Sequence, residues 1–482
     1  MKLNRRQFIG TTACAAAPLI FTGCTTCSSS VRAYKVNGII KIGIIGIGRI
    51  STGMDMPGVM AFPDKCRITA VCDIDSVRLA HGKKFVEERY AKNNIVQKVD
   101  TYSDYIDMID NAGIDAVMVC VPDHWHALCA CAAIAAGKHI WLQKPFAQTI
   151  KEGRLIANLA KRTGCVMQVG AWQRSCKNFH DICELARNGR VGEITRVEIG
   201  IGCDHSGGSS KEEPVPATFD YEKWLGPTPA GVPYNWTRCH NQDLKRIGDR
   251  PGWIQLAPYG WGMITNWGAH HLDIMHWGLG QDFGGPDSVR GTCEWMDLSG
   301  GKLWNVHTHY DLHYMYGKTE VHVCDKFPMG VKFIGEKGDW LYCERGGAKV
   351  TPSDPKGDGK MGPFMASNVK LLEPIANPTV KLKVSSNHFG NWLEGIQLGD
   401  PDYTINCAEA AHRSTAACSL GHMVMELGRG KKDGAEIKWD PKAETTGSAE
   451  ADKLMTPFAR DKYDLKTVLA HYGLCYDKVM KG

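Results

Sequence analysis

A glycine-rich turn after an apolar segment constrains the fold of this chain more than any other feature. The run Ile39–Ile45 is almost wholly apolar and leads directly into the turn Gly46–Gly48. A buried strand, a tight Gly-x-Gly turn and a helix form the first unit of a doubly wound α/β sheet that receives a dinucleotide. Free N–H groups at the start of the helix then face the pyrophosphate. Ser51 replaces the third glycine of the usual motif. The residues predicted to contact the dinucleotide are Gly46, Gly48, Arg49 and Ile50.

An acidic residue after the next apolar segment supports this interpretation. The segment Arg67–Cys72 has the composition of a strand, and Asp73 follows it directly. A carboxylate at this distance beyond the glycines binds the ribose hydroxyls of a dinucleotide. Because a carboxylate repels a 2′-phosphate, Asp73 predicts NAD as the cofactor, with NADP less favoured. The alternative is an ordinary tight turn between a strand and a helix, with no ligand.

The order of segments predicts two domains. Strands and helices alternate from residue 38 to residue 171, as a parallel sheet requires. Within this part, Asp123 is placed to cap a helix over 127–136, and Thr149 to cap the following helix. We predict an α/β fold in which 38–171 form a Rossmann domain with a doubly wound parallel sheet.

The remainder, residues 172–482, has a different pattern. Helices are expected over 177–187 and 408–427, and alternating strands over 193–199, 303–316, 319–323 and 331–334. This pattern predicts a C-terminal α+β domain for substrate binding and oligomerisation, with an open, mostly antiparallel sheet that helices cover on one face. The stretch 207–258 is rich in Gly, Pro, Trp and Asn and is expected to form an ordered loop over a pocket.

The N-terminus predicts export. Arg5 and Arg6, followed by Phe8 and a stretch of small apolar residues, are typical of a twin-arginine signal. The segment 21–24 ends in Cys24 in the manner of a lipoprotein box, and acylation there would anchor the protein to a membrane. We expect a signal over 1–24, a linker over 25–37 and a periplasmic protein. A general secretory signal or a basic N-terminus without function are the alternatives.

Charge and cysteine content exclude several classes of protein. The chain has 482 residues, with 57 basic and 52 acidic side chains, so its net charge of +5 indicates no nucleic-acid surface. After the signal, no apolar run has the length needed to span a bilayer. Its 19 cysteines show no metal-ligand spacing in the body of the chain and are expected to be buried thiols.

A row of polar side chains lies on one predicted strand. His307, His309, Asp311 and His313 alternate and would share one face. Same-face neighbours on a strand are roughly 7 Å apart, too far for most pairs of metal ligands unless a second strand contributes. We therefore predict no metal and interpret this face as a polar sheet surface that packs against a second subunit.

Several motifs together resemble one protein family. They occur in the order Gly46-x-Gly48, Val121–His126, Gln143–Pro145, Gln168–Gly170 and Gly268–Asp273. This series resembles the Gfo/Idh/MocA oxidoreductases. The closing stretches 330–338 and 437–441 resemble the bacterial branch that includes exported glycan-processing members. The resemblance implies a Rossmann half, a second half with an open antiparallel sheet, and hydride transfer at a sugar carbon.

The resemblance also implies roles for individual residues. Lys144 matches the catalytic lysine, and His270 matches a general base, for which a pKa near neutrality is suited. Where the family has acidic residues, this chain has Gln143 and Asn266. Because a neighbouring carboxylate keeps a lysine charged, the neutral Gln143 predicts easier loss of the proton from Lys144.

Other positions follow from the same motifs. Pro122, His126 and Gln143 are expected beside the cofactor, with Asn266 beside the catalytic pair. Gln173, Arg174, His271 and Trp267 are expected to bind the substrate, although a salt bridge is the alternative for Arg174. Asp273 is expected to be a structural hydrogen-bond partner.

The sequence thus predicts an NAD-dependent oxidoreductase that acts on a hydroxyl of a sugar or glycoside, for instance oxidising C3 to a keto-sugar, with a tightly bound cofactor. One alternative is NAD-dependent glycoside cleavage that is redox-neutral overall. The other is a protein that binds nucleotide and glycan without turnover. The released product distinguishes the three.

Overall fold

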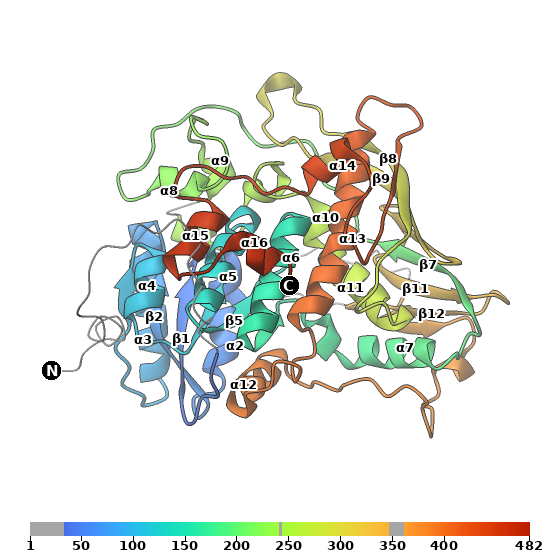
Figure 1. The fold of residues 1–482 in the computed structure, drawn as a ribbon, viewed down its shortest axis with the longest axis horizontal. Coiled ribbons are helices and arrows are strands. Elements are labelled where there is room, and N and C mark those ends of the chain that lie inside the picture. Colours follow the sequence, from blue (N-terminus) through green and yellow to red (C-terminus); the bar gives the residue numbers. More distant parts are fainter. Residues whose placement is uncertain (1–32, 241–242, 347–360) are drawn as a thin grey trace, which may run out of the picture.

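The computed structural model describes residues 33–240, 243–346 and 361–482. Two sheets with their helices lie side by side, the N-terminal sheet on the left of Figure 1 and the second sheet on the right. In the described part of the chain, no helix combines the length and apolarity needed to cross a membrane. The predicted signal over 1–24, with Arg5, Arg6 and Cys24, lies outside the described residues, as does most of the predicted linker.

The first sheet has six parallel strands in the order β3-β2-β1-β4-β5-β6. The strands are β1 Ile40–Ile45, β2 Cys66–Cys72, β3 Asp100–Tyr102, β4 Ala116–Val119, β5 His139–Leu142 and β6 Met167–Val169. In the register of the sheet, Ile45 of β1 lies beside Cys72 of β2 and Val119 of β4. The residues after these strands therefore meet at one edge, where the strand order reverses and where open α/β sheets bind ligands.

Helices cover both faces of this sheet. They are α2 Met56–Met60, α3 Ser76–Ala91, α4 Tyr105–Asn111, α5 His126–Ala135 and α6 Ile150–Thr163, and the π-helix η1 Ser51–Asp55 follows the glycine turn. Thr149 caps α6 together with Glu152 in a capping box, which confirms the predicted cap. The predicted cap at Asp123 is wrong, because a 3₁₀ turn, η2 Asp123–Trp125, precedes α5 and no side chain caps that helix.

The second sheet has eight strands in the order β13-β12-β11-β7-β10-β9-β8-β14. These are β7 Ile194–Gly200, β8 Ser288–Trp295, β9 His307–Tyr316, β10 Thr319–Cys324, β11 Gly330–Gly335, β12 Trp340–Cys343, β13 Phe364–Ala366 and β14 Ala435–Lys438. Only the β7–β10 pair is parallel, so the sheet is mostly antiparallel, as predicted.

Helices pack on one face of this sheet (Figure 1). The covering helices are α7 Lys177–Arg187, α11 Gly268–Leu279 and α13 Ala408–Leu427. On β9, His309, Asp311 and His313 point away from these helices, as predicted. His307 does not. It is fully buried and contacts the Trp261 carbonyl, because the pairing of β8 with β9 is irregular beside it.

Short elements complete the chain. They are η3 Trp172–Ser175, α8 Tyr221–Leu225, α9 Trp236–Cys239, η4 Leu244–Arg246, η5 Gly252–Gln255, α10 Met263–Asn266, η6 Ser299–Gly301, η7 Val369–Leu372, α12 His388–Leu398, α14 Ala449–Leu454, α15 Leu465–His471 and α16 Tyr476–Met480. Three of them pack back onto the first domain. Phe389 of α12 stacks on Trp141 of β5 with ring centres 4.2 Å apart, while α15 and α16 contact α5 and α6. The first sheet is thus covered partly by residues far outside the predicted range 38–171.

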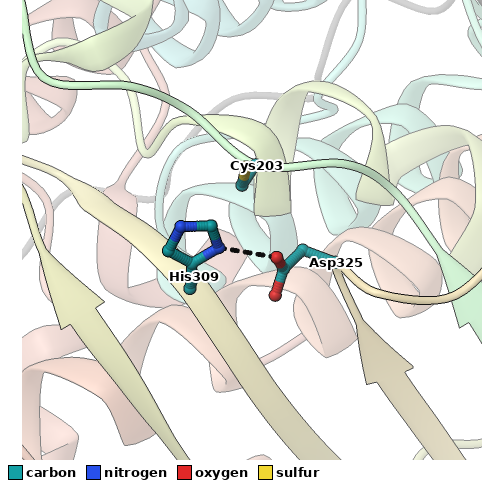
Figure 2. A group of neighbouring side chains, drawn as sticks. All are labelled: Cys203, His309 and Asp325. Atoms are coloured by element: carbon teal, nitrogen blue, oxygen red, sulfur yellow. Dashed lines mark hydrogen bonds and ion pairs between the residues drawn. The ribbon is translucent and has the colours of Figure 1, made fainter.

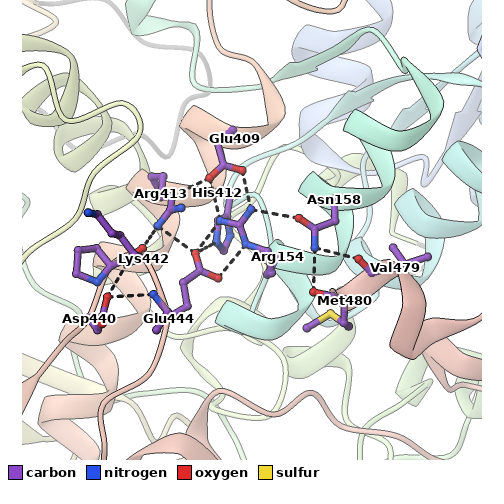
Figure 3. Close-up of polar contacts among 12 residues, drawn as sticks. Arg154, Asn158, Glu409, His412, Arg413, Asp440, Lys442, Glu444, Val479 and Met480 are labelled. Atoms are coloured by element: carbon purple, nitrogen blue, oxygen red, sulfur yellow. Dashed lines mark hydrogen bonds and ion pairs between the residues drawn. The ribbon is translucent and has the colours of Figure 1, made fainter. Parts of the chain in front are cut away.

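An ion network also joins the two domains (Figure 3). Arg154 on α6 lies 2.7 Å from Glu409 of α13 and 2.7 Å from Glu444, and Glu444 also accepts a hydrogen bond from His412. Burial raises the pKa of Glu409, but the hydrogen bond and charge of Arg154 outweigh burial and bring that pKa to about 2. The network is therefore charged at neutral pH and fixes α13 against α6. The cysteines of the described part are all unpaired thiols, as predicted.

Candidate active site

A pocket lies at the carboxyl edge of the first sheet, above the glycine turn. Residues Gly46–Ile50 line one side of it, and Asp73 lines the neighbouring side. Pro122, Gln143, Lys144 and Asn266 also line it. Of the residues predicted to contact the cofactor, His126 alone does not line the pocket, because its ring nitrogens contact the carbonyls of Pro145 and Val121 beneath it.

The glycine turn has the geometry that close approach of a ligand requires. Gly46 has a φ of +91°, and a Cβ there would lie 2.5 Å from the Cys120 carbonyl oxygen, so only glycine fits. Ser51, at the position of the third glycine, accepts a hydrogen bond from the Gly48 N–H at 2.8 Å. The serine hydroxyl thus closes the turn from below while the surface of the turn stays open to the pocket.

Asp73 is fixed by the same turn. Its carboxylate accepts hydrogen bonds from the N–H groups of Ile47 at 2.7 Å and Asp75 at 2.8 Å, one on each oxygen. Each carboxylate oxygen has a further lone pair that a ribose hydroxyl can use. Burial raises the pKa of Asp73 to about 6, and the charge of Arg78, another pocket residue, opposes that rise.

Residues far along the chain cover this pocket. The lining from the stretch predicted as a loop comprises Phe219, Lys223, Trp224, Cys239, His240, Arg246, Ile247, Asp249, Pro251, Trp253 and Ile254. Arg78, from the first domain, donates a hydrogen bond to the His240 carbonyl across the pocket. Tyr463, near the C-terminus, adds a further wall. The dinucleotide half of the site is therefore enclosed by two segments outside the Rossmann domain.

Lys144 lines the same pocket. It follows β5, and its Nζ donates to the backbone oxygen of Asn266 at 3.0 Å. The side chain of Asn266 is not the acceptor. Asp123 lines the same pocket, and burial raises its pKa to about 8 while the charge of Lys144 lowers it. A carboxyl group therefore lies near Lys144 after all, supplied by Asp123 rather than by position 143.

A second carboxyl group lies behind Gln143. The Gln143 amide nitrogen donates to both carboxylate oxygens of Asp55, each at 2.8 Å, and the Cys120 thiol donates to the same group. Asp55 is completely buried, and burial raises its pKa to about 7 although these donors lower it. Gln143 therefore has an acid as its hydrogen-bond partner, and its amide can donate where a carboxylate could not. The sequence analysis missed Asp55, since no local pattern marks it.

His270 belongs to the same neighbourhood as Lys144. It is buried, and burial places the pKa of His270 well below its usual value, with the charges of Arg345 and Lys144 adding to the effect. The imidazole is therefore neutral, but a pKa well below its usual value makes His270 a weaker base than the near-neutral pKa expected from the sequence.

Arg345, which the sequence analysis also missed, lies between two tryptophans at the end of β12. Its guanidinium lies 4.6 Å from the Trp172 ring centre and 4.2 Å from that of Trp267. Gln173, with its amide oriented to satisfy both neighbours, donates to the His270 carbonyl at 3.1 Å and accepts from Arg345 at 2.9 Å. The structure thus brings Gln173 and Trp267, both predicted for the substrate, beside His270.

Two predicted substrate residues have structural partners instead. Arg174 is buried and pairs with Asp273 and Asp282, at 2.8 Å each, so its prediction as a sugar ligand is wrong and Asp273 is the structural partner expected. His271 is fully buried and contacts the Gly200 carbonyl at 2.9 Å. Both side chains stabilise the second domain behind the site.

Comparisons with known proteins agree with this fold. The model of the oxidoreductase family with NAD-binding Rossmann fold matches residues 40–171. A curated relative, glycosyl hydrolase family 109 protein 2 of Shewanella sp. (strain ANA-3), is 27% identical over 220 residues, which cover 40% of this chain and 45% of the relative. Inositol 2-dehydrogenase 1 of Saccharopolyspora erythraea is 29% identical over 223 residues, which cover 44% and 60% of the two chains. The chain thus spans less than two thirds of the length of the curated relatives it matches.

Solved structures match over a longer range. The WlbA dehydrogenase from Bordetella pertussis, in complex with NADH and UDP-GlcNAcA, has a TM-score of 0.55 and 14% identity over 83% of this chain and 99% of its own. The aldose-aldose oxidoreductase from Caulobacter crescentus, complexed with glycerol, has a TM-score of 0.55 and 18% identity over the same shares. At these identities the likeness shows the fold alone. Residues 40–171 thus match the NAD-binding Rossmann domain of the Gfo/Idh/MocA oxidoreductase family, and the glycine turn and the parallel sheet agree with that match.

Proposed function

We propose that this protein is an NAD-dependent oxidoreductase that oxidises a hydroxyl group of a sugar or glycoside and retains its cofactor. The observation that carries the proposal is that the glycine turn, Asp73 and Lys144 line one pocket, which residues outside the Rossmann domain enclose. The names of relatives support the substrate class, since one is an inositol 2-dehydrogenase and another a glycosyl hydrolase.

The residues of the pocket fit NAD. The open surface of the turn at Gly46–Ile50 suits the pyrophosphate, and the remaining lone pairs of Asp73 suit the adenosine ribose. NAD, when bound, supplies a hydride acceptor at its nicotinamide ring. The protein then has to bind the sugar, exclude water and accept the hydroxyl proton.

Proton transfer is assigned to Lys144 and His270. The Asn266 carbonyl accepts a hydrogen bond from the Lys144 amine, and Asp123 lies near enough for the charge of Lys144 to lower the pKa of its carboxyl group. The neutral His270 has the protonation state of a base. Trp267 and Gln173, beside His270, offer an aromatic surface and an amide for sugar hydroxyls.

The nucleotide content of purified protein tests this proposal. Protein isolated without added nucleotide and then denatured should release near-stoichiometric NAD or NADH, identified by mass spectrometry, because the enclosing residues slow its escape. Gly46→Val protein, in which the added side chain collides with the Cys120 carbonyl, should carry little. Native protein that is empty and depends on freely exchanging NAD would contradict retention, and a protein that binds no NAD would contradict the proposal.

Redox-neutral glycoside cleavage is a second candidate. The relatives named as glycosyl hydrolases favour it, and so does the enclosed pocket, because a cofactor that is restored in each cycle need not leave. A panel of glycosides followed by mass spectrometry separates the candidates. A keto-sugar indicates oxidation, a released aglycone with no net NADH indicates cleavage, and unchanged glycosides indicate a binding protein.

Export, the lipid anchor and a homo-oligomer remain predictions. A twin-arginine route would suit a retained cofactor, since the chain could fold around NAD before transport. An Arg5→Lys/Arg6→Lys variant should then accumulate in the cytoplasm with its nucleotide. Secretion of that variant at the wild-type level would contradict the predicted route.

A further inference from the structure

Three side chains of types that can bind metals meet at one edge of the second sheet, outside the pocket (Figure 2). Figure 2 shows Cys203 on the loop after β7, His309 on β9 and Asp325 at the end of β10. β10 runs parallel to β7 and antiparallel to β9, so the ends of β7 and β10 and the beginning of β9 lie together. On β9 alone, the donor side chains are too far apart to share a metal ion. The two neighbouring strands supply the donors that β9 lacks.

The spacing of the donor atoms fits one small ion. His309 Nδ1 and Asp325 Oδ2 are 2.7 Å apart, and the donor atoms of all three residues lie within 4.8 Å of one another. Zinc bonds of about 2.0–2.3 Å in a tetrahedral arrangement place ligand atoms about 3.3–3.8 Å apart. Movements of about 1 Å or less, within reach of side-chain rotation, convert the observed arrangement into such a site.

We propose that Cys203, His309 and Asp325 bind a zinc ion or a similar divalent transition metal, with a water molecule as fourth ligand. Thiolate, imidazole and carboxylate are the ligand types that zinc accepts. The proposal is independent of the function proposed for the pocket.

The surroundings of the cluster favour a cation. Asp325 is only 6% exposed, and its second oxygen accepts the Tyr310 N–H at 3.1 Å, which orients the carboxylate as an outer hydrogen bond orients a metal ligand. The side chain of His309 is 47% exposed, so an ion can enter from solvent.

A second group on the same sheet face provides a contrast. Asp311, His313 and His322 also lie close enough to share an ion. There, however, His322 already contacts Asp311 and also lies 2.9 Å from an Arg196 guanidinium nitrogen, while His313 lies 2.8 Å from Glu320. Arg196 lies at the opposite ring nitrogen, Nδ1, from the Nε2 atom of His322 that faces Asp311, so its positive charge opposes a second cation on this ring. This group therefore serves as the internal control.

The position of the cluster suggests what the ion does. Cys203 begins the segment that covers the pocket, and its neighbour Asp204 accepts a hydrogen bond from the Met263 N–H at 2.7 Å, at the start of α10. Tyr310 donates to the carbonyl of Gly202 on the other side. An ion held by Cys203 would fix the base of the covering segment against β9 and β10.

Metal content and cobalt spectroscopy test the proposal. Tag-free protein, stripped with a chelator and dialysed against zinc, should hold about one zinc per chain by mass spectrometry. Cobalt should give the absorption of a tetrahedral site with a thiolate-to-metal band. Cys203→Ser should abolish that band. Because loss of an outer-shell partner already costs about 10–100-fold in affinity, His309→Ala should weaken zinc binding by more than about 100-fold.

Three control variants make the result specific. Cys293→Ser, at a half-buried thiol on the same sheet, and His313→Ala and His322→Ala, in the second group, should bind zinc as the wild type does. All variants should melt like the stripped wild type in chelator, which shows that they are folded. Wild-type protein that binds no zinc or cobalt at micromolar free metal would overturn the proposal. Equal binding by Cys203→Ser and His309→Ala, or loss of binding in the second group, would also overturn it.

Discussion

Replacing Gln143 by glutamate, the residue usual in the family, is expected to destabilise this protein. The wild-type amide donates to both oxygens of Asp55 at 2.8 Å in a completely buried site. In Gln143→Glu, two carboxyl groups face each other at that distance. Like charges so close cannot both ionise, so the pair retains one proton.

The magnitude follows from this proton. In the unfolded chain a glutamate ionises with a pKa near 4.3, so keeping it protonated at pH 7 costs about 3.7 kcal/mol, at about 1.36 kcal/mol per pH unit. The pKa of the pair is higher in the folded protein than in the unfolded chain. The variant is therefore most stable at low pH and loses stability as the pH rises. From pH 6 to pH 8 the variant should lose about 2.7 kcal/mol and the wild type, whose Asp55 has a pKa of about 7, about 1.4 kcal/mol, so the gap between them should widen by about 1.4 kcal/mol.

Urea denaturation at pH 6, 7 and 8 measures this gap. The double variant Asp55→Asn/Gln143→Glu reverses the hydrogen bond, with an amide now at position 55, and should recover most of the loss. Asp55→Asn alone should remove the fall in stability that the wild type shows as pH rises from about 4 to 7, since burial raises the pKa of Asp55 to about 7. A Gln143→Glu protein as stable as the wild type at pH 8 would refute the assignment of Asp55 as an acid opposite Gln143.

The remaining predictions concern the site and the domain contact. Lys144→Met and His270→Ala should each lower turnover by about two or more orders of magnitude, with nucleotide content unchanged, and wild-type turnover in either would exclude that residue from proton transfer. Asp73→Ala should weaken NAD binding and reduce the ratio of NAD affinity to NADP affinity in competition titrations. A wild-type protein that prefers NADP would contradict the assignment of Asp73 to the ribose. Arg154→Met should lower the free energy of unfolding by about 1–3 kcal/mol, because Glu409 and Glu444 are partly buried and keep only Arg413 as a cation. A change below about 0.5 kcal/mol would show that the network is only a surface contact.

The first domain could be predicted because its signals are local. The strand β1 is a continuous apolar run, and the glycine turn and Asp73 follow their strands directly. Helical periodicity likewise gave the bounds of α7, and α13 also has the predicted bounds, ending before Gly428. In these segments, neighbouring residues in the sequence decide the structure.

The rest depends on contacts between distant segments. The strands β8, β12 and β14 were not predicted, because they are short or half-exposed and their partners lie elsewhere in the chain. Asp55 and Arg345 enter the site from a π-helix and a strand end, and nothing in their local sequence marks them. Arg174 was misassigned for the same reason, since its two acidic partners lie about a hundred residues later.

The most direct test of the central claim is whether a sugar reduces nicotinamide that the protein already carries. Protein purified without added nucleotide would be mixed with a panel of sugars and glycosides while the near-ultraviolet absorbance of reduced nicotinamide is followed. The proposed function predicts that at least one sugar raises this absorbance, or is cleaved with only a transient rise, and that Lys144→Met protein with the same nucleotide content shows neither. Loaded wild-type protein that gives no spectral change and no product with any sugar, or equal rates in Lys144→Met, would contradict the account.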